Sequence, residues 1–386
     1  MGENQIVMSK NVLITGGAGF IGSHLSLKLV DKGYNVLVLD TLNPQIHGEN
    51  PSLTSPLFCS IKDKVRIKHG SVTDRHLLES LIPGQNIIVH LAAETGTGQS
   101  MYEIERYCNI NIGGTALLMD ILTNIPNQIR KVVVASSRAI YGEGKYWSPE
   151  IGVVYPNERK EEDLKRGLFE VSYPECTQML QLMGTDEESK IHPTSVYGVT
   201  KQVQEQLVMT VCKSLGKSAV ALRLQNVYGP GQSLSNPYTG ILSIFSTRIK
   251  NNQSINIFED GLESRDFVYI VDVVEAIILS IEKEEANDHI FNVGSGVSTS
   301  VNEVVNNLMK CYGIEVPIIH TGNFRLGDIR HNFADLAKIK RLLGFESHVT
   351  FDKGIEKFTN WVNQQEIVED KYELSLLELK CKGLLK

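Results

Sequence analysis

The chain has 386 residues, 42% of them hydrophobic and 22% charged, which suits one large globular α/β domain with a smaller one beside it. Its net charge of −7 argues against a general nucleic-acid binder, because such proteins usually carry a basic stripe. No apolar segment approaches membrane-spanning length, and the first residues lack the pattern of a signal peptide, so we expect a cytoplasmic protein that contacts no membrane.

The first predicted element is a strand at residues 11–15, which runs directly into a glycine-rich turn. Gly16, Gly19 and Gly22 permit a tight turn and a close approach of the backbone to a ligand, and apolar residues at helical spacing follow from Phe20. A strand, a glycine turn and a helix in this order hold a pyrophosphate at the positive end of the helix. The stretch therefore predicts a dinucleotide-binding site.

A second predicted strand, residues 35–39, ends at Asp40. An acidic residue about 20 positions beyond the glycines is placed to hold the ribose hydroxyls and to repel a 2′-phosphate. No Arg or Lys occurs from Asp40 to Asn50, so we expect NAD as the cofactor, and not NADP. The proline-bearing residues that follow, 43–56, are predicted to form a loop over the mouth of the site.

Strands and helices then alternate, which indicates a doubly wound parallel sheet. The further strands are predicted at residues 65–69, 87–93, 131–135 and 218–223. Asp74, after the first of them, is placed to contact the adenine, to cap the next helix, or to do both. His90, within the second, is expected to be an internal hydrogen-bonding residue and not a base or metal ligand.

The pattern of elements changes after residue 228. Shorter strands and helices follow one another up to a helical, amphipathic tail at residues 366–386. We therefore expect an α/β fold with a Rossmann domain at 1–228 and a smaller α/β substrate-binding lobe at 229–386.

Residues 143–194 lack periodicity and carry a run of charges at 158–166, which predicts a solvated insertion. Its place between Ser137 and Tyr197 leaves a substrate-covering role as the alternative. The six cysteines occur singly along the chain, so we expect reduced thiols and no metal site.

Three residues form a candidate acid–base group. Tyr197 and Lys201 stand one turn apart on a predicted helix, and Ser137 ends a predicted parallel strand, the edge at which such sheets place reacting groups. A neighbouring ammonium and a nicotinamide ring would both favour the phenolate and lower the pKa of Tyr197 by about 1–3 units. The tyrosine would then act as an acid–base catalyst near pH 7.

Together, the glycine turn, Asp40, Ser137 and the Tyr197/Lys201 pair resemble the extended short-chain dehydrogenase/reductase family of nucleotide-sugar enzymes, over residues 11–361. The resemblance implies a catalytic trio of Ser137, Tyr197 and Lys201. It implies NAD contacts from Gly16, Gly19, Phe20, Ile21, Gly22, Asp40, Asp74, Leu91, Ala92, Ala93, Asn111, Tyr197 and Lys201. It implies a nucleotide diphosphate-sugar substrate held by Ser137, Arg138, Asn226, Arg265 and Arg325, and a homodimer.

The resemblance favours one reaction over its alternatives. Sugar 4,6-dehydratases of this family usually carry Asp-Glu after the catalytic hydroxyl residue, where this chain has Arg138-Ala139. A 4-ketoreductase would consume a reduced cofactor, often NADPH, which Asp40 disfavours. A 4-epimerase that passes through a 4-keto sugar fits better. The segments 93–102 and 137–144 resemble the dTDP-L-rhamnose 4-epimerase branch, although only Cys176 stands in the insertion where that branch often has paired cysteines. A UDP-hexose 4-epimerase and a non-catalytic dinucleotide sensor or scaffold remain alternatives.

Overall fold

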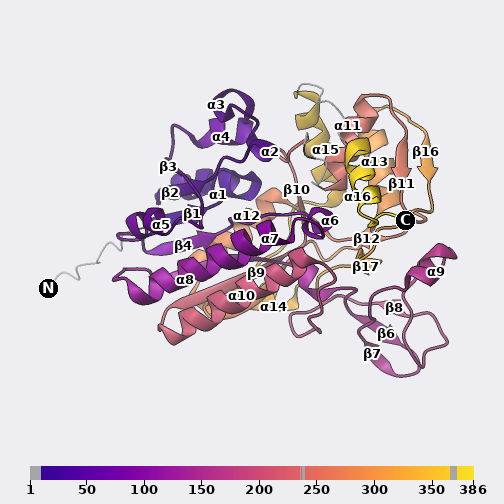
Figure 1. Cartoon of the computed structure of the whole chain (residues 1–386), viewed down its shortest axis with the longest axis horizontal. Coiled ribbons are helices and arrows are strands. Elements are labelled where there is room, and N and C mark those ends of the chain that lie inside the picture. The colour runs from indigo at the N-terminus through magenta and orange to yellow at the C-terminus, as the bar shows by residue number, and fades with distance from the viewer. Residues whose placement is uncertain (1–9, 235, 237–239, 366–371) are drawn as a thin grey trace.

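The computed structural model describes residues 10–234, 236, 240–365 and 372–386. A parallel sheet of seven strands lies at its centre, in the order β14-β9-β5-β4-β1-β2-β3 (Figure 1). The strands are β1 (Asn11–Thr15), β2 (Asn35–Asp40), β3 (Arg66–His69), β4 (Ile87–His90), β5 (Lys131–Ser137), β9 (Ser218–Leu224) and β14 (His289–Val293). The predicted doubly wound sheet is confirmed.

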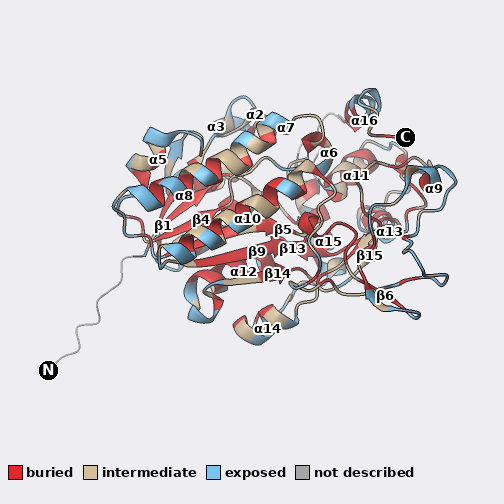
Figure 2. Cartoon of the chain, turned by 60° about the horizontal axis from the view of Figure 1, so that its bottom comes forward, coloured by how far each residue is buried: buried red, intermediate tan, exposed pale blue. Residues whose placement is uncertain are grey.

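Helices cover both faces of this sheet, because side chains of each strand alternate between two cores. Val12 and Ile14 of β1 pack on the face with α1 (Phe20–Asp31) and α12 (Ile270–Glu282), whereas Leu13 packs on the other face. The helices of that other face are α5 (Arg75–Leu81), α8 (Gly114–Asn124) and α10 (Val196–Ser214). Figure 2 shows the buried strands between helices whose outer sides are exposed.

One strand of the sheet comes from beyond residue 228. β14 pairs with β9, and α12 packs against α1, although both lie in the part of the sequence expected to form the smaller lobe. The prediction that the strand at 218–223 is the last one to join this sheet is therefore wrong. Periodicity identifies β14 as a strand but carries no information about which sheet it joins.

The remaining strands and helices beyond β9 form the smaller lobe, with three small sheets. Its strands are β10 (Asn226–Tyr228), β11 (Ile255–Ile257), β12 (Ser264–Arg265), β13 (Phe267–Tyr269), β15 (Thr299–Ser300), β16 (Ile318–His320) and β17 (His331–Asn332). Its helices are α11 (Ile241–Lys250), α13 (Val301–Tyr312), α15 (Phe351–Asn363) and α16 (Tyr372–Cys381), whereas α14 (Ala337–Leu343) packs against β14 of the large sheet. In Figure 1 this lobe lies on one side of the large sheet, with α16 and the C-terminus on its surface.

One segment differs from its prediction, and one helix has an irregular turn. The loop expected at 43–56 contains three short helices, α2 (Pro44–His47), α3 (Pro51–Thr54) and α4 (Pro56–Ile61). Each begins at a proline, which the first turn of a helix accepts because no backbone N–H partner is needed there. The helix ahead of β5 is broken into α7 (Ile104–Tyr107), a π-helical turn (Cys108–Gly113) and α8.

The insertion folds into a small unit of its own. It contains a sheet of β6 (Tyr146–Ser148), β7 (Gly152–Val154) and β8 (Gln181–Leu182), and the helix α9 (Glu161–Lys165). A small core of Tyr146, Val154, Val171 and Leu180 lies under this sheet. Within the described part of the chain, no helix is long and apolar enough to cross a membrane.

Candidate active site

The glycine turn brings the backbone of β1, α1 and β4 into close contact. Gly16 has a φ of +71°, and a Cβ atom added to it would lie 2.8 Å from the backbone nitrogen of Ala92. A Cβ atom on Gly22 would lie 2.4 Å from the carbonyl oxygen of Gly16. Only glycine fits at these two positions, and the turn forms the floor of a cavity of about 470 Å³.

Asp40 stands at the C-terminal end of β2 and lines the same cavity. Its carboxylate accepts hydrogen bonds from the backbone N–H groups of Ala18 (2.9 Å) and Leu42 (2.8 Å). The nearby His47 is buried, and burial lowers its pKa, so it is neutral at pH 7. Asp40 therefore keeps a negative charge beside the cavity, which favours ribose hydroxyls over a 2′-phosphate.

The cavity fits a dinucleotide chemically. Ser136 Oγ is buried and has no hydrogen-bond partner among the described residues, so a ligand can satisfy it. Lys201 is the only Lys or Arg among the described lining residues, and it belongs to the candidate catalytic trio. The residues of the turn and of the small-residue strand end that line the cavity are Gly16, Gly19, Phe20, Ile21, Gly22, Leu91, Ala92 and Ala93.

The candidate catalytic trio meets at one end of this cavity. Ser195 caps α10 by accepting a hydrogen bond from the Gly198 N–H (3.1 Å), which starts the helix two residues before Tyr197. A Cβ atom on Gly198 would lie 2.6 Å from the carbonyl oxygen of Ala139, so α10 packs directly on the segment after Ser137. The hydroxyl groups of Ser137 and Tyr197 share a hydrogen bond. Both side chains and Lys201 line the cavity.

Burial dominates the ionisation of the two titrating groups. It raises the pKa of Tyr197, against the opposing effects of the Ser137 hydrogen bond and the charge of Arg138. Burial also lowers the pKa of Lys201 to about 7. The lowered pKa predicted for Tyr197 beside Lys201 and a bound nicotinamide ring stays a prediction, because in the protein alone burial outweighs the nearby charge. The cation that acts on the phenol is Arg138, and the Lys201 ammonium donates to Gln204 Oε1 (2.8 Å).

A buried chain of hydrogen bonds continues from Lys201 into the sheet. Gln204 Nε2 donates to Thr115 Oγ1 (2.8 Å), which lies 2.9 Å from His90 Nε2. Thr15 Oγ1 lies 2.7 Å from His90 Nδ1. Burial lowers the pKa of His90 to about 3, so it is neutral and hydrogen-bonded on both ring nitrogens, as predicted. Gln204 lies one helical turn after Lys201, so its spacing was the signal that could have identified it. Thr115 had no such signal, because it joins this network through Gln204 from a distant part of the sequence.

A second cavity, of about 300 Å³, adjoins the first and shares Ser137 and Tyr197 with it. The other predicted substrate residues, Arg138, Asn226, Arg265 and Arg325, all line it. Burial and the charge of Arg265 lower the pKa of Arg138 to about 10. Three guanidinium groups thus gather in one small buried space.

Asp328 is the carboxylate nearest to these cations. Its oxygens lie 2.8 Å from Arg265 Nη2 and 3.1 Å from Arg325 Nη2. Burial disfavours its charged form, but the charges of Arg325 and Arg265 hold the pKa of Asp328 well below its usual range. Glu259 and Glu263 also line this cavity, but they pair with Arg159 and Arg330, which lie outside the lining. Asp328 is then the carboxylate that offsets the three lining arginines, and guanidinium groups gathered in this way suit a diphosphate.

A family model described as the NAD dependent epimerase/dehydratase family matches residues 12–294. The chain belongs to this family. It is 36% identical over 362 residues to a dTDP-L-rhamnose 4-epimerase of Burkholderia thailandensis, covering 93% of this chain and 97% of the relative. It is 29% identical to a putative UDP-glucose 4-epimerase of Methanocaldococcus jannaschii, covering 91% and 98%.

Solved structures give the same picture. A UDP-glucose 4-epimerase of Thermotoga maritima, solved with UDP-glucose, superposes with a TM-score of 0.73 at 28% identity over 92% of this chain and 99% of that one. MoeE5 with UDP-glucuronic acid and NAD superposes with a TM-score of 0.72 at 26% identity over the same shares. The cofactor of this epimerase/dehydratase family member is therefore NAD, as the sequence predicted.

Two predicted NAD contacts lie elsewhere in this epimerase/dehydratase family member. Asp74 is exposed, caps α5 through the Leu77 N–H (3.1 Å), and is not among the described residues that line the NAD cavity. Asn111 is fully buried in the π-helical turn, and it too lies outside that lining. It accepts from the Glu94 N–H (2.7 Å) and donates to Thr200 Oγ1 (2.9 Å). Asn111 therefore positions α10 against the loop after β4.

The insertion, residues 143–194, supports the second cavity from outside; this cavity, which the predicted substrate residues line, is called the substrate cavity below. None of the described lining residues comes from 143–194, so the substrate-covering alternative has no contact here to support it. Arg159 reaches from the insertion to Glu259, with both Nη atoms 2.8 Å from its carboxylate oxygens. Glu259 does line the cavity. The insertion thus holds one wall in place.

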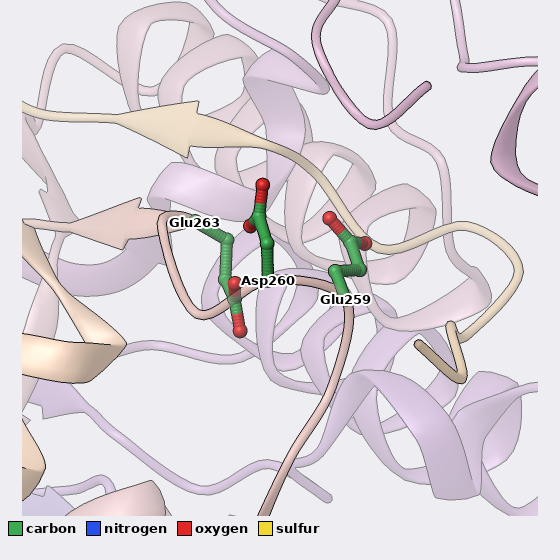
Figure 3. Close-up of side chains that lie close together, drawn as sticks. All are labelled: Glu259, Asp260 and Glu263. Atoms are coloured by element: carbon green, nitrogen blue, oxygen red, sulfur yellow. The ribbon is translucent and has the colours of Figure 1, made fainter. Parts of the chain in front are cut away.

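An acidic cluster beside this wall consists of Glu259, Asp260 and Glu263 (Figure 3). Arg330 lies among these carboxylates, with Nη1 3.0 Å from Glu259 and 2.8 Å from Asp260. Arg159 neutralises Glu259 from the other side. The cluster is therefore a cradle for arginines, which the sequence could not reveal because Arg159 and Arg330 come from segments far from residues 259–263.

Proposed function

We propose that the protein is an NAD-dependent 4-epimerase of dTDP- or UDP-hexoses, with dTDP-L-rhamnose and dTDP-6-deoxy-L-talose as the candidate sugar pair. The observation that carries the proposal is the junction of the two cavities at Ser137 and Tyr197, with an acidic ribose site on one side and three arginines on the other. The 36% identity to a dTDP-L-rhamnose 4-epimerase supports this choice of sugar nucleotide.

The protein's own groups would divide the work. The glycine turn and Asp40 would hold NAD, which, when bound, supplies the hydride acceptor and donor for the sugar C4. Tyr197 takes the proton of the C4 hydroxyl as that carbon is oxidised and returns it after the sugar has presented its other face. Ser137 hydrogen-bonds the same oxygen and orients it. The hydride and the proton both return, so substrate and product are isomers.

Two observations disfavour the related reactions. The residue after Ser137 is the cationic Arg138, whose Nε donates to Asn226 Oδ1 (3.2 Å), so this position supplies no acid for dehydration. Asp40 disfavours NADPH, the usual cofactor of a ketoreductase. The presence of Tyr197 and the buried Lys201 at the cavity argues against a sensor or scaffold, which has no use for an acid–base pair.

The test is incubation with NAD and a panel of dTDP- and UDP-sugars, followed by proton NMR of the anomeric region. We expect a new epimer without net formation of NADH. Tyr197→Phe should reduce turnover by roughly 100-fold or more, because the proton acceptor is lost while the ring remains. Conversion of no sugar, with NAD still bound, would support a sensor, and full activity of Tyr197→Phe would remove the tyrosine from its role.

A further inference from the structure

The last helix of the chain, α16, lies against the substrate cavity. Tyr372, Ser375, Leu376 and Leu379 all line it, and their spacing places them on one face of the helix. Leu374 and Leu377 lie on the other side and are 66% and 58% exposed. We propose that the C-terminal segment Tyr372–Lys386, called the tail wall below, forms part of the nucleotide subsite and sets the affinity for the substrate; this inference rests on the proposed function.

The tail wall is tied to the lobe at its helical end. Glu373 Oε1 lies 3.0 Å from Arg248 Nη1 of α11, and the Arg248 guanidinium lies over the ring of Tyr372, 5.1 Å from its centroid. α11 itself contributes Ile241, Ile244 and Phe245 to the cavity. These contacts therefore fix α16 in position against α11, which forms another wall of the cavity.

Its other end pairs with the segment that carries a substrate arginine. Leu385 and Arg325 form an antiparallel bridge. The Phe324 N–H donates to the Lys386 carbonyl and the Lys386 N–H donates to the Phe324 carbonyl, both at 3.0 Å. The tail wall thus fixes the backbone at Arg325, one of the three cations suited to a diphosphate.

The chemistry of the wall indicates which part of a substrate it faces. Leu376 and Leu379 are apolar, and Phe245, Phe258 and the amide of Asn256 line the same cavity. An apolar slot with one amide suits a flat heterocyclic base, whereas the arginines suit the diphosphate. The occupant of the wall is therefore the base and ribose of the nucleotide, and not NAD.

The test compares two leucines on one helix. Leu376→Ala removes a side chain from the cavity, and Leu377→Ala removes one from the exposed side of α16. Isothermal titration calorimetry measures the Kd of each variant for dTDP, UDP and NAD, without any need for turnover. We expect Leu376→Ala to raise the Kd of the nucleoside diphosphates about three- to tenfold, because an apolar contact is lost, and to leave the Kd of NAD unchanged. Leu377→Ala should match the wild type for all three.

A chain ending at Gln365 extends the test. It loses both the wall and the backbone pairing at Arg325, so the Kd of the nucleoside diphosphates should rise by more than about tenfold while NAD still binds. Equal affinities of Leu376→Ala and Leu377→Ala would overturn the inference and leave the proposed function standing. A wild-type protein that binds neither dTDP nor UDP would overturn the proposed function, and this inference with it. Should the shortened chain lose NAD binding as well, it has lost its fold, and the two leucine variants decide.

Discussion

The buried Gln204 offers a test of how the fold supports the active site. Gln204→Leu keeps the approximate size of the side chain but removes the acceptor of the Lys201 ammonium and the donor to Thr115 at once. A hydrogen bond to a charged group contributes about 1.5–3 kcal/mol, and the Lys201–Gln204 distance of 2.8 Å is that of a well-formed bond. Losing it disfavours the ammonium and lowers the pKa of Lys201 further below its value of about 7.

If the charge of Lys201 assists proton transfer at Tyr197, losing the hydrogen bond from Lys201 to Gln204 raises the activation free energy of turnover. A change of about 1.5–3 kcal/mol corresponds to a fall in kcat of roughly 10- to 150-fold at pH 7. The assay is turnover of the sugar nucleotide identified by NMR, together with thermal unfolding to show that the variant is folded. Gln206→Leu, on the exposed side of α10, is the matched control. A kcat for Gln204→Leu equal to that of Gln206→Leu would show that this buried network has no part in catalysis.

Two further changes test the charges on either side of the site. Asp40→Asn keeps the hydrogen-bond acceptor for Ala18 but removes the negative charge. The ratio of NAD to NADP affinity, measured by calorimetry with both cofactors, should therefore fall about tenfold or more. An unchanged ratio would contradict the role of Asp40. Glu143 is 1% exposed, and burial raises its pKa from near 4.5 to about 7, against the opposing effect of Arg159. Between these two pH values the folded protein therefore keeps a proton on Glu143 that the unfolded chain has released. The contribution of Glu143 to the free energy of unfolding therefore falls by roughly 3 kcal/mol as the pH rises from about 4.5 to 7. Glu143→Gln should flatten that fall in urea unfolding series at about pH 5 and pH 8; identical pH dependence in the variant and the wild type would rule Glu143 out as the titrating group.

Local patterns predicted much of the cofactor half. The glycine turn, Asp40 and the trio of Ser137, Tyr197 and Lys201 were all found from spacing, because each depends on a strand end or on a single helical turn. A capping box of Ser300 with Glu303 at the start of α13 likewise joins residues only three positions apart. Chemistry that depends on residues close in sequence can be predicted from the sequence.

The other predictions for the site residues depend on contacts between distant parts of the chain, and the structure corrected or extended them. Asp74 caps α5, which confirms one of its two predicted roles, and Asn111 packs inside the fold. At Tyr197 in the protein alone, burial, which spacing does not report, outweighs the nearby charges.

The sequence by itself determined the fold class and the cofactor and predicted the candidate catalytic trio, since these follow from short stretches whose glycines, acids and apolar periods act locally. Only the tertiary structure decided that β14 completes the sheet, that Arg159 and Arg330 neutralise the acidic cluster, and that the final helix reaches the substrate cavity. Those contacts join residues up to several hundred positions apart, and their energies come from burial and charge, which exist only once the chain has folded.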